Sequence, residues 1–267
     1  MESYRLKNII LLILALTNLF LLATLLSRRA DEARLLHASA EQVSQLFARQ
    51  DIALDPDLIP SGRPSEVLNL ARNTKEEGRL AAFFLGRDTD VTDEGGGLTR
   101  YESSQGSLVF RSSGDFDLTA SLETPEPEDF CAGFFRRFGY REESAELDGG
   151  TGTVTALQYF SGIPVVNCTV TFTFSNGTLS SVIGRHLPEK NAAAAAADCI
   201  TAFTAMTAFL SARSEARLDC STVTEVELGY ALQNTPAAPL SLVPVWRITT
   251  DAFQCYVNSM TGEVVWL

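Results

Sequence analysis

The sequence predicts an α+β fold in which an N-terminal transmembrane helix precedes repeated modules of a helix packed on antiparallel strands. An apolar stretch at residues 9–26 lies between a basic lead and Arg28-Arg29, which is the pattern of a membrane span. Further along the chain, segments with apolar residues at every second position alternate with segments where they recur every three to four positions. These are the periods of strands and helices, respectively.

Residues 9–26 have the length of one membrane-spanning helix. Eighteen residues at about 1.5 Å rise cover roughly 27 Å, close to the thickness of a hydrocarbon core. The stretch leads into Ser27-Arg28-Arg29 without a small-x-small cleavage pattern, which favours an uncleaved anchor over a cleaved signal peptide. Residues 1–8 are therefore expected to be a cytoplasmic lead, and the C-terminal domain of this single-pass cell-membrane protein to be extracytoplasmic.

The charge and the cysteines exclude several classes of function. The chain carries 21 Lys and Arg against 33 Asp and Glu, so its surface repels nucleic acid, and we expect no nucleic-acid partner. Five cysteines without a C-x-x-C pair argue against a zinc ribbon or a thioredoxin-like site. We expect most of them to be small buried hydrophobic residues, with a disulfide between Cys199 and Cys220 left open.

The first part of the outside domain is predicted to begin with a helix. Residues 30–51 form an amphipathic juxtamembrane helix, with a stripe at Leu36, Ala40, Val43 and Phe47. A first α+β module follows over residues 66–140. Its expected elements are strands at 80–85, 99–103, 108–111 and 116–122, and a helix from Pro127 to Gly139 with Phe130, Phe134 and Phe138 on one face.

A second α+β module is predicted over residues 150–267. It begins with strands from Thr153 onwards, which turn at Asn176-Gly177, a dipeptide typical of tight hairpins. A helix is expected from Ala192, because alanine favours helices and Asn191 suits the cap position. Its buried stripe is Ile200, Phe203, Met206 or Thr207, and Leu210. The remaining expected elements are strands at 179–183, 223–230, 243–249, 253–258 and 263–266, with a proline-rich crossing at 235–239.

Catalytic and metal-binding patterns are weak in this sequence. His37 and His186 lack the neighbouring cysteines or carboxylates of a metal site or a catalytic dyad. The acidic run 88–95 lacks the glycine and the glutamate that a calcium loop requires at its sixth and twelfth positions. Aromatic residues near the C-terminus are expected to pack in the core rather than to line a groove: Trp246, Tyr256 and Trp266. We therefore expect that the protein is not an enzyme and holds no cofactor. An extracytoplasmic enzyme with a hidden site is the least favoured alternative.

Four parts of the chain carry a recognisable set of motifs: residues 4–10 (YRLKNII) with 17–21 (TNLFL), 157–165 (LQYFSGIPV), 242–248 (LVPVWRI) and 255–263 (CYVNSMTGE). Together they resemble the YycI family, relatives of YycH that are single-span extracytoplasmic regulators of an essential sensor kinase in low-GC Gram-positive bacteria. The closing pattern also occurs in PepSY-like domains. The family pattern lacks the five cysteines and the alanine-rich helix of this chain.

The resemblance implies that the chain modulates a sensor histidine kinase through its membrane span and outside domain, with a YycH-like sister protein as a further partner. Helices in lipid associate through polar side chains and close packing, so the candidate partner-binding residues are Thr17, Asn18 and Thr24. A local or water-mediated hydrogen bond of Asn18 stays an alternative. The second function considered is a PepSY-like inhibitor or chaperone of an extracellular peptidase, acting through a sheet edge or groove.

Overall fold

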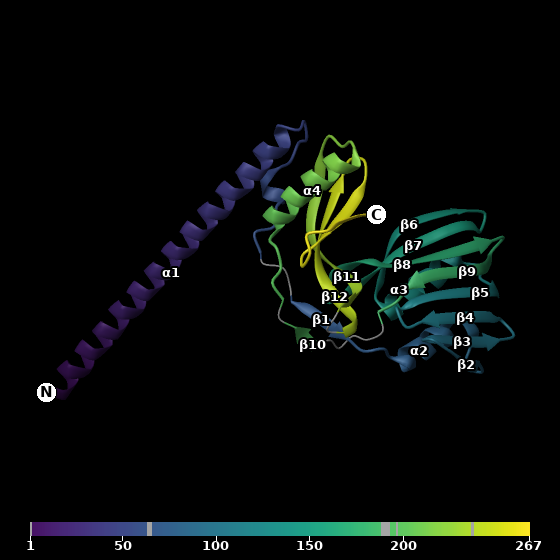
Figure 1. Cartoon of the computed structure of the whole chain (residues 1–267). Coiled ribbons are helices and arrows are strands. Elements are labelled where there is room, and N and C mark those ends of the chain that lie inside the picture. Colours follow the sequence, from purple (N-terminus) through teal and green to yellow (C-terminus); the bar gives the residue numbers. More distant parts are fainter. Residues whose placement is uncertain (1, 63–65, 188–192, 196, 236–237) are drawn as a thin grey trace.

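A computed structural model describes residues 2–62, 66–187, 193–195, 197–235 and 238–267. These residues form a mixed α+β architecture with one large sheet and a long N-terminal helix that projects from it (Figure 1). The helices are α1 (Glu2–Ala48), the short 3-10 helix η1 (Pro56–Leu58), α2 (Thr74–Leu85), α3 (Pro127–Phe138) and α4 (Ala202–Ala216).

Fourteen strands are present in the described part of the chain. They are β1 (Val67–Leu70), β2 (Asp90–Gly95), β3 (Leu98–Ser103), β4 (Gly106–Arg111), β5 (Asp115–Glu123), β6 (Tyr140–Asp148), β7 (Thr151–Phe160), β8 (Ile163–Ser175), β9 (Thr178–Arg185), β10 (Ala193–Ala195), β11 (Val223–Thr235), β12 (Ala238–Thr250), β13 (Gln254–Asn258) and β14 (Val264–Trp266). The main path through the sheet is β10-β1-β12-β11-β8-β9-β5-β4-β3-β2. Strands β7 and β6 extend from β8, and β13 and β14 extend from β12.

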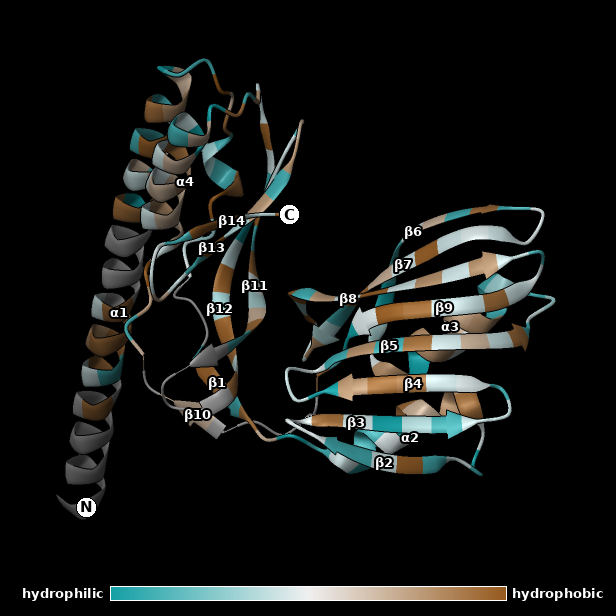
Figure 2. Cartoon of the chain, turned by 45° about the vertical axis from the view of Figure 1, so that its right-hand side comes forward, coloured by the Kyte–Doolittle hydropathy of each residue, from teal (hydrophilic) through white to brown (hydrophobic). Residues whose placement is uncertain are grey.

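The first half of the fold comprises strands β2–β9, and α2 and α3 cover one face of them (Figure 2). Its core is rich in phenylalanine, with the Phe134 ring 4.7 Å from the Phe138 ring and 5.1 Å from the Phe172 ring. The predicted helix at 127–139 is confirmed. Pro127 stands in its first turn, and Gly139 ends it in the left-handed conformation at φ 78°.

The second half comprises β1 and β10–β14, packed against α4 and the last turns of α1. The predicted stripe on α1 is confirmed for Ala40, Val43 and Phe47, which are buried, while Leu36 is only half-buried. The Phe47 ring stacks on the Phe209 ring of α4 with centroids 5.9 Å apart. Trp246 is also buried, and its indole N–H donates to the Ile200 carbonyl at 3.0 Å. The second core therefore joins the N-terminal helix to the C-terminal strands.

The two halves meet where β8 runs parallel to β11, through the residue pair Val165 and Tyr230. The side chain of Asn167 extends this contact. Its amide nitrogen donates to the Leu232 carbonyl at 2.9 Å, and its amide oxygen accepts from the Leu232 N–H at 2.8 Å. The Asn167 side chain thus takes the place of one step of the backbone ladder, and it satisfies both the backbone N–H and the carbonyl of Leu232.

The prediction of a strand at residues 80–85 is wrong, because these residues form the second half of α2. The Asn73 side chain caps the helix by accepting from the backbone N–H groups of Lys75 and Glu76. Leu80 and Phe84, four residues apart, both face the core. A short apolar run is compatible with either period, and the cap upstream decides between them.

The prediction of a helix from Ala192 is also wrong for the first part of that segment. Ala193–Ala195 form β10, which pairs antiparallel with β1, and α4 begins at Ala202 with Thr201 as its cap. Alanine has a high helix propensity but almost no side chain to bury, so pairing with a neighbouring strand outweighs it. Asn191, the expected cap, lies outside the described residues, and Ile200 precedes the helix.

The hairpin at Asn176-Gly177 is confirmed, with positive φ values of 52° and 72°. Strands 223–230 and 243–249 are longer than expected. They continue towards the proline-rich residues until Thr235 pairs with Ala238, so this region is a hairpin and not a crossing.

Strands β7, β8 and β9 cover residues 151–185, which the sequence assigns to the second module. In the structure β9 pairs with β5 of the first module. The module boundaries 66–140 and 150–267 stay a prediction.

We predict that Asn167→Ala lowers the free energy of unfolding by about 1–3 kcal/mol, because both backbone groups of Leu232 lose their partner. Urea denaturation followed by tryptophan fluorescence measures this change. Thr169→Ala is the matched control, since Thr169 is exposed two residues further along β8. Equal stability losses in the two variants would show that Asn167 does not join the halves.

Candidate functional site

The predicted partner-binding residues lie on the part of α1 that projects from the domain (Figure 1). The Thr24 hydroxyl donates to the Leu21 carbonyl at 2.8 Å, while the side chains of Thr17 and Asn18 are exposed. Thr17 and Thr24 are two helical turns apart and share one side of the helix, with Asn18 about 100° away. These three residues are remote from the cavities of the sheet.

No helix in the described part of the chain contains a stretch that meets the length and hydropathy expected of a membrane span. The span at 9–26 stays a prediction.

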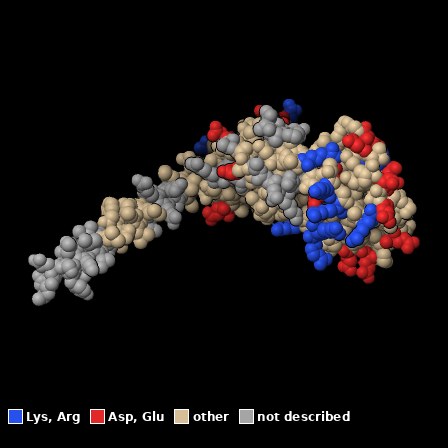
Figure 3. Space-filling view, turned by 90° about the horizontal axis from the view of Figure 1, so that it is seen from below, with Lys and Arg blue, Asp and Glu red and all other residues tan. Residues whose placement is uncertain are grey.

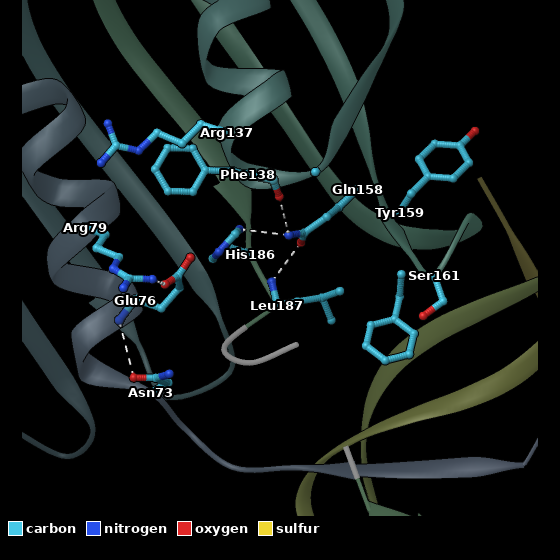
Figure 4. A pocket seen from close by; sticks show the side chains of 12 residues that line it. Asn73, Glu76, Arg79, Arg137, Phe138, Gln158, Tyr159, Ser161, His186 and Leu187 are labelled. Atoms are coloured by element: carbon cyan, nitrogen blue, oxygen red, sulfur yellow. Dashed lines mark hydrogen bonds and ion pairs between the residues drawn. The ribbon is translucent and has the colours of Figure 1, made fainter. Parts of the chain in front are cut away.

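A pocket of about 710 Å³ lies between the start of α2, the end of α3 and the turn from β7 to β8 (Figure 4). Each element borders the pocket at one of its ends. Asn73 caps the start of α2, Gly139 ends α3, and Ser161 lies in the turn between β7 and β8 at φ 51°. The side chains around it include three aromatic rings, two arginines and one carboxylate: Phe138, Tyr159, Phe160, Arg79, Arg137 and Glu76.

Gln158 forms the polar floor of this pocket. Its amide nitrogen donates to the Phe138 carbonyl at 3.1 Å, and its amide oxygen accepts from the Leu187 N–H at 2.8 Å. The side chain is only 4% exposed. One buried amide therefore holds together the end of α3, strand β7 and the segment that leaves β9.

His186 lies beside Gln158 and is also buried. Its Nδ1 atom is 3.0 Å from the Gln158 amide nitrogen and 3.2 Å from the Tyr140 hydroxyl, which donates to the Arg185 carbonyl at 2.8 Å. Because the amide nitrogen can only donate, Nδ1 accepts and the neutral ring carries its proton on Nε2. Burial raises the pKa of Tyr140 well above its ordinary value, so this hydroxyl stays neutral. His186 follows a strand end, as expected, but it is part of a buried network.

The rim of the pocket is basic. Arg137 lies over the Phe138 ring at 5.6 Å, and Arg141 lies over the Tyr159 ring at 4.0 Å. Arg79 pairs with Glu76 at 2.9 Å. Among the ion pairs of the described residues, none involves Arg137 or Arg141. Figure 3 shows basic side chains gathered on this part of the first half, while acidic side chains lie towards its outer end.

An ion pair supports the strand that leads to His186. The Arg185 guanidinium donates to both carboxylate oxygens of Asp115, at 2.7 and 3.0 Å. Burial pushes the pKa of Asp115 up, but hydrogen bonds from Arg185 and Ser113 outweigh burial and lower it. The pKa of Arg185 is raised, mainly by its hydrogen bond to Asp115. The charged pair therefore stabilises the folded chain wherever Asp115 is ionised.

Other sequence-predicted residues have structural roles. His37 is exposed on α1, with its Nδ1 atom 3.5 Å from a carboxylate oxygen of Glu41. All five cysteines are free thiols, so the disulfide between Cys199 and Cys220 is absent, and all except Cys199 are buried. The C-terminal aromatic residues pack as expected: Trp246 and Tyr256 are buried, and the Trp266 ring lies 5.4 Å from the Phe253 ring.

Sequence reasoning missed the pocket and its floor. The available signal was Gln158, a polar residue inside the apolar run Leu157-Gln-Tyr-Phe160. An amide at such a position is buried and needs partners. Its partners, Phe138 and Leu187, are 20 and 29 residues away, so only the sheet topology identifies them.

Comparisons with known proteins found no family model and no curated protein that matches the chain. Among solved structures, an uncharacterized protein from Eubacterium rectale is 10% identical, with 77% of this chain and 86% of that chain covered and a TM-score of 0.43. The Bacillus megaterium YpeB C-terminal domain is 12% identical, with 74% and 98% covered and a TM-score of 0.37. At these values neither likeness bears on function.

We predict that Asp115→Asn lowers the free energy of unfolding by about 1 kcal/mol at neutral pH, because it leaves the half-buried Arg185 charge unpaired. Since folding lowers the pKa of Asp115, this stabilisation is complete above the ordinary value of 3.8 and is lost as the pH falls through the folded value. Urea denaturation between pH 3 and 7 should show the two proteins converging at low pH. Asp88→Asn, an exposed carboxylate, is the control. A difference that does not change with pH would contradict the role of the charge.

Proposed function

We propose that this protein is a membrane-anchored extracytoplasmic regulator that modulates a sensor histidine kinase through its N-terminal helix and its outside domain. The resemblance of its segments to the YycI family motivates the proposal. The observation that supports it best is that α1 continues from the predicted span into the second core.

The continuity of α1 matters because regulation through a membrane helix requires that motion of the helix reaches the outside domain. α1 has 47 residues and contains neither glycine nor proline, so it lacks the residues that most often kink helices. Its last turns are fixed by Phe47 against Phe209, and by the Ser44 hydroxyl, which donates to the Leu54 carbonyl at 2.7 Å. A shift or rotation of the helix would therefore displace the second core directly.

The polar side chains of the predicted span provide the proposed contact with kinase helices. In lipid, apolar side chains gain nothing from burial against another helix, so a hydrogen bond between helices can decide which helices associate. Asn18 has both a donor and an acceptor on an exposed side chain. Thr17 and Thr24 place two further hydroxyl groups on the neighbouring side of the helix.

We predict that Asn18→Leu reduces the amount of sensor kinase that co-purifies with the full chain by about fivefold, the effect of losing about 1 kcal/mol of interhelical hydrogen bonding. Quantitative pull-down from membranes of cells that express both proteins measures this. Asn18→Gln is the matched control, because it keeps the amide and should retain the kinase. Full recovery of kinase with Asn18→Leu would remove Asn18 from the interface.

Exchanging residues 9–26 for an unrelated span separates the two functions that the sequence favours. Kinase regulation, read from a reporter gene under the response regulator, should be lost in this variant. A peptidase inhibitor that acts through its outside domain would keep its activity. Unchanged kinase output would contradict the proposed function.

A further inference from the structure

We propose that the pocket between α2, α3 and the β7–β8 turn binds an acidic peptide segment of a partner protein, with Arg137 holding a carboxylate of the peptide. This inference goes beyond the proposed function, which depends on the N-terminal helix. It assigns a second binding site, in the first half of the fold, whose helices α2 and α3 lie away from α1 (Figure 1).

The charges of the pocket favour a carboxylate ligand. Two arginines and one glutamate line it, and that glutamate, Glu76, is used by Arg79. Arg137 has no carboxylate within ion-pair distance among the described residues, although the chain has 33 acidic residues. A guanidinium group matches the two oxygens of a carboxylate in a bidentate pair. The position of Arg137 at the end of α3 suits the helix dipole, but the dipole does not explain why the charge borders a cavity.

The walls of the pocket favour a peptide over a simple anion or a lipid surface. Rings of Phe138, Tyr159 and Phe160 border it, and its volume of about 710 Å³ far exceeds that of a single carboxylate or phosphate group. A layer of headgroups would meet the rim and leave the space beside these rings unfilled. A peptide with alternating acidic and apolar side chains fits both surfaces at once.

An occupant of this pocket would contact residues that pack directly against the second half of the fold. Phe160 and Leu187, which line it, pack in the apolar cluster that also contains Tyr230 and Leu232 of β11. The Phe160 and Tyr230 rings meet edge to face at 6.1 Å. Binding should therefore strengthen the junction that Asn167 maintains, and it should raise the unfolding temperature of the whole domain.

The test uses the full chain in a neutral detergent and a fluorescein-labelled hexapeptide with four glutamates and two phenylalanines. Fluorescence anisotropy measures its affinity, and a peptide with four glutamines in place of the glutamates is the charge control. We expect the acidic peptide to bind at least about tenfold more tightly than the glutamine peptide. Arg137→Glu should weaken this binding by about tenfold or more, and Arg137→Gln by less.

Arg87→Glu is the matched protein control, because it makes the same change of charge at an exposed residue beyond the other end of α2. It should bind the peptide as the wild type does. Near-UV circular dichroism verifies that each variant is folded. Any of three results would overturn the proposal. They are equal losses of affinity in Arg87→Glu and Arg137→Glu, no binding at about 1 mM peptide, and binding of phosphatidylglycerol vesicles in place of the peptide. No kinase is present, so failure here is distinguishable from failure of the proposed kinase regulation.

Discussion

The burial of the last turns of α1 is the constraint on which the rest of the second half depends. Phe47 is fully buried and stacks on Phe209, and the next buried residues, Ile52 and Leu54, complete the same core. Burying one phenylalanine side chain contributes about 1.5–3 kcal/mol. Without this contact α4 and the C-terminal strands would expose an apolar face, and α1 would have no fixed direction. The N-terminal helix and the domain are therefore one packed unit.

The two halves of the fold share far fewer backbone ladder pairs than each half has within it. Within the second half, β11 and β12 pair along most of their lengths. Between the halves the ladder has a single parallel residue pair, extended by the Asn167 amide. An ion pair of 3.5 Å between Arg247 of β12 and Glu143 of β6 adds a further link. The proposed peptide pocket borders this junction, so a ligand there acts where the backbone ladder between the halves is short.

The sequence predicted most elements whose pattern is local. The helix from Pro127, the hairpin at Asn176-Gly177 and the stripe on α1 depend on caps, turn residues and periodicity, which lie within a few residues of one another. It failed where tertiary pairing decides, as at Ala193–Ala195, which joins β1 across more than 120 residues. The candidate pocket was not predicted for the same reason. Arg137 has an ordinary local explanation at the end of a helix, and only the fold brings it and Gln158 to one cavity. The span and its polar residues stay predictions.

Hydrogen exchange of the full chain tests most directly whether α1 is part of the folded core. The amides of residues 40–48 should be protected to the same degree as those of α4, because opening them requires disruption of the second core. The amides of β11 and β12 provide the reference for global unfolding. Exchange of residues 40–48 at rates typical of a frayed helix, with α4 still protected, would contradict this coupling and leave α1 independent of the domain.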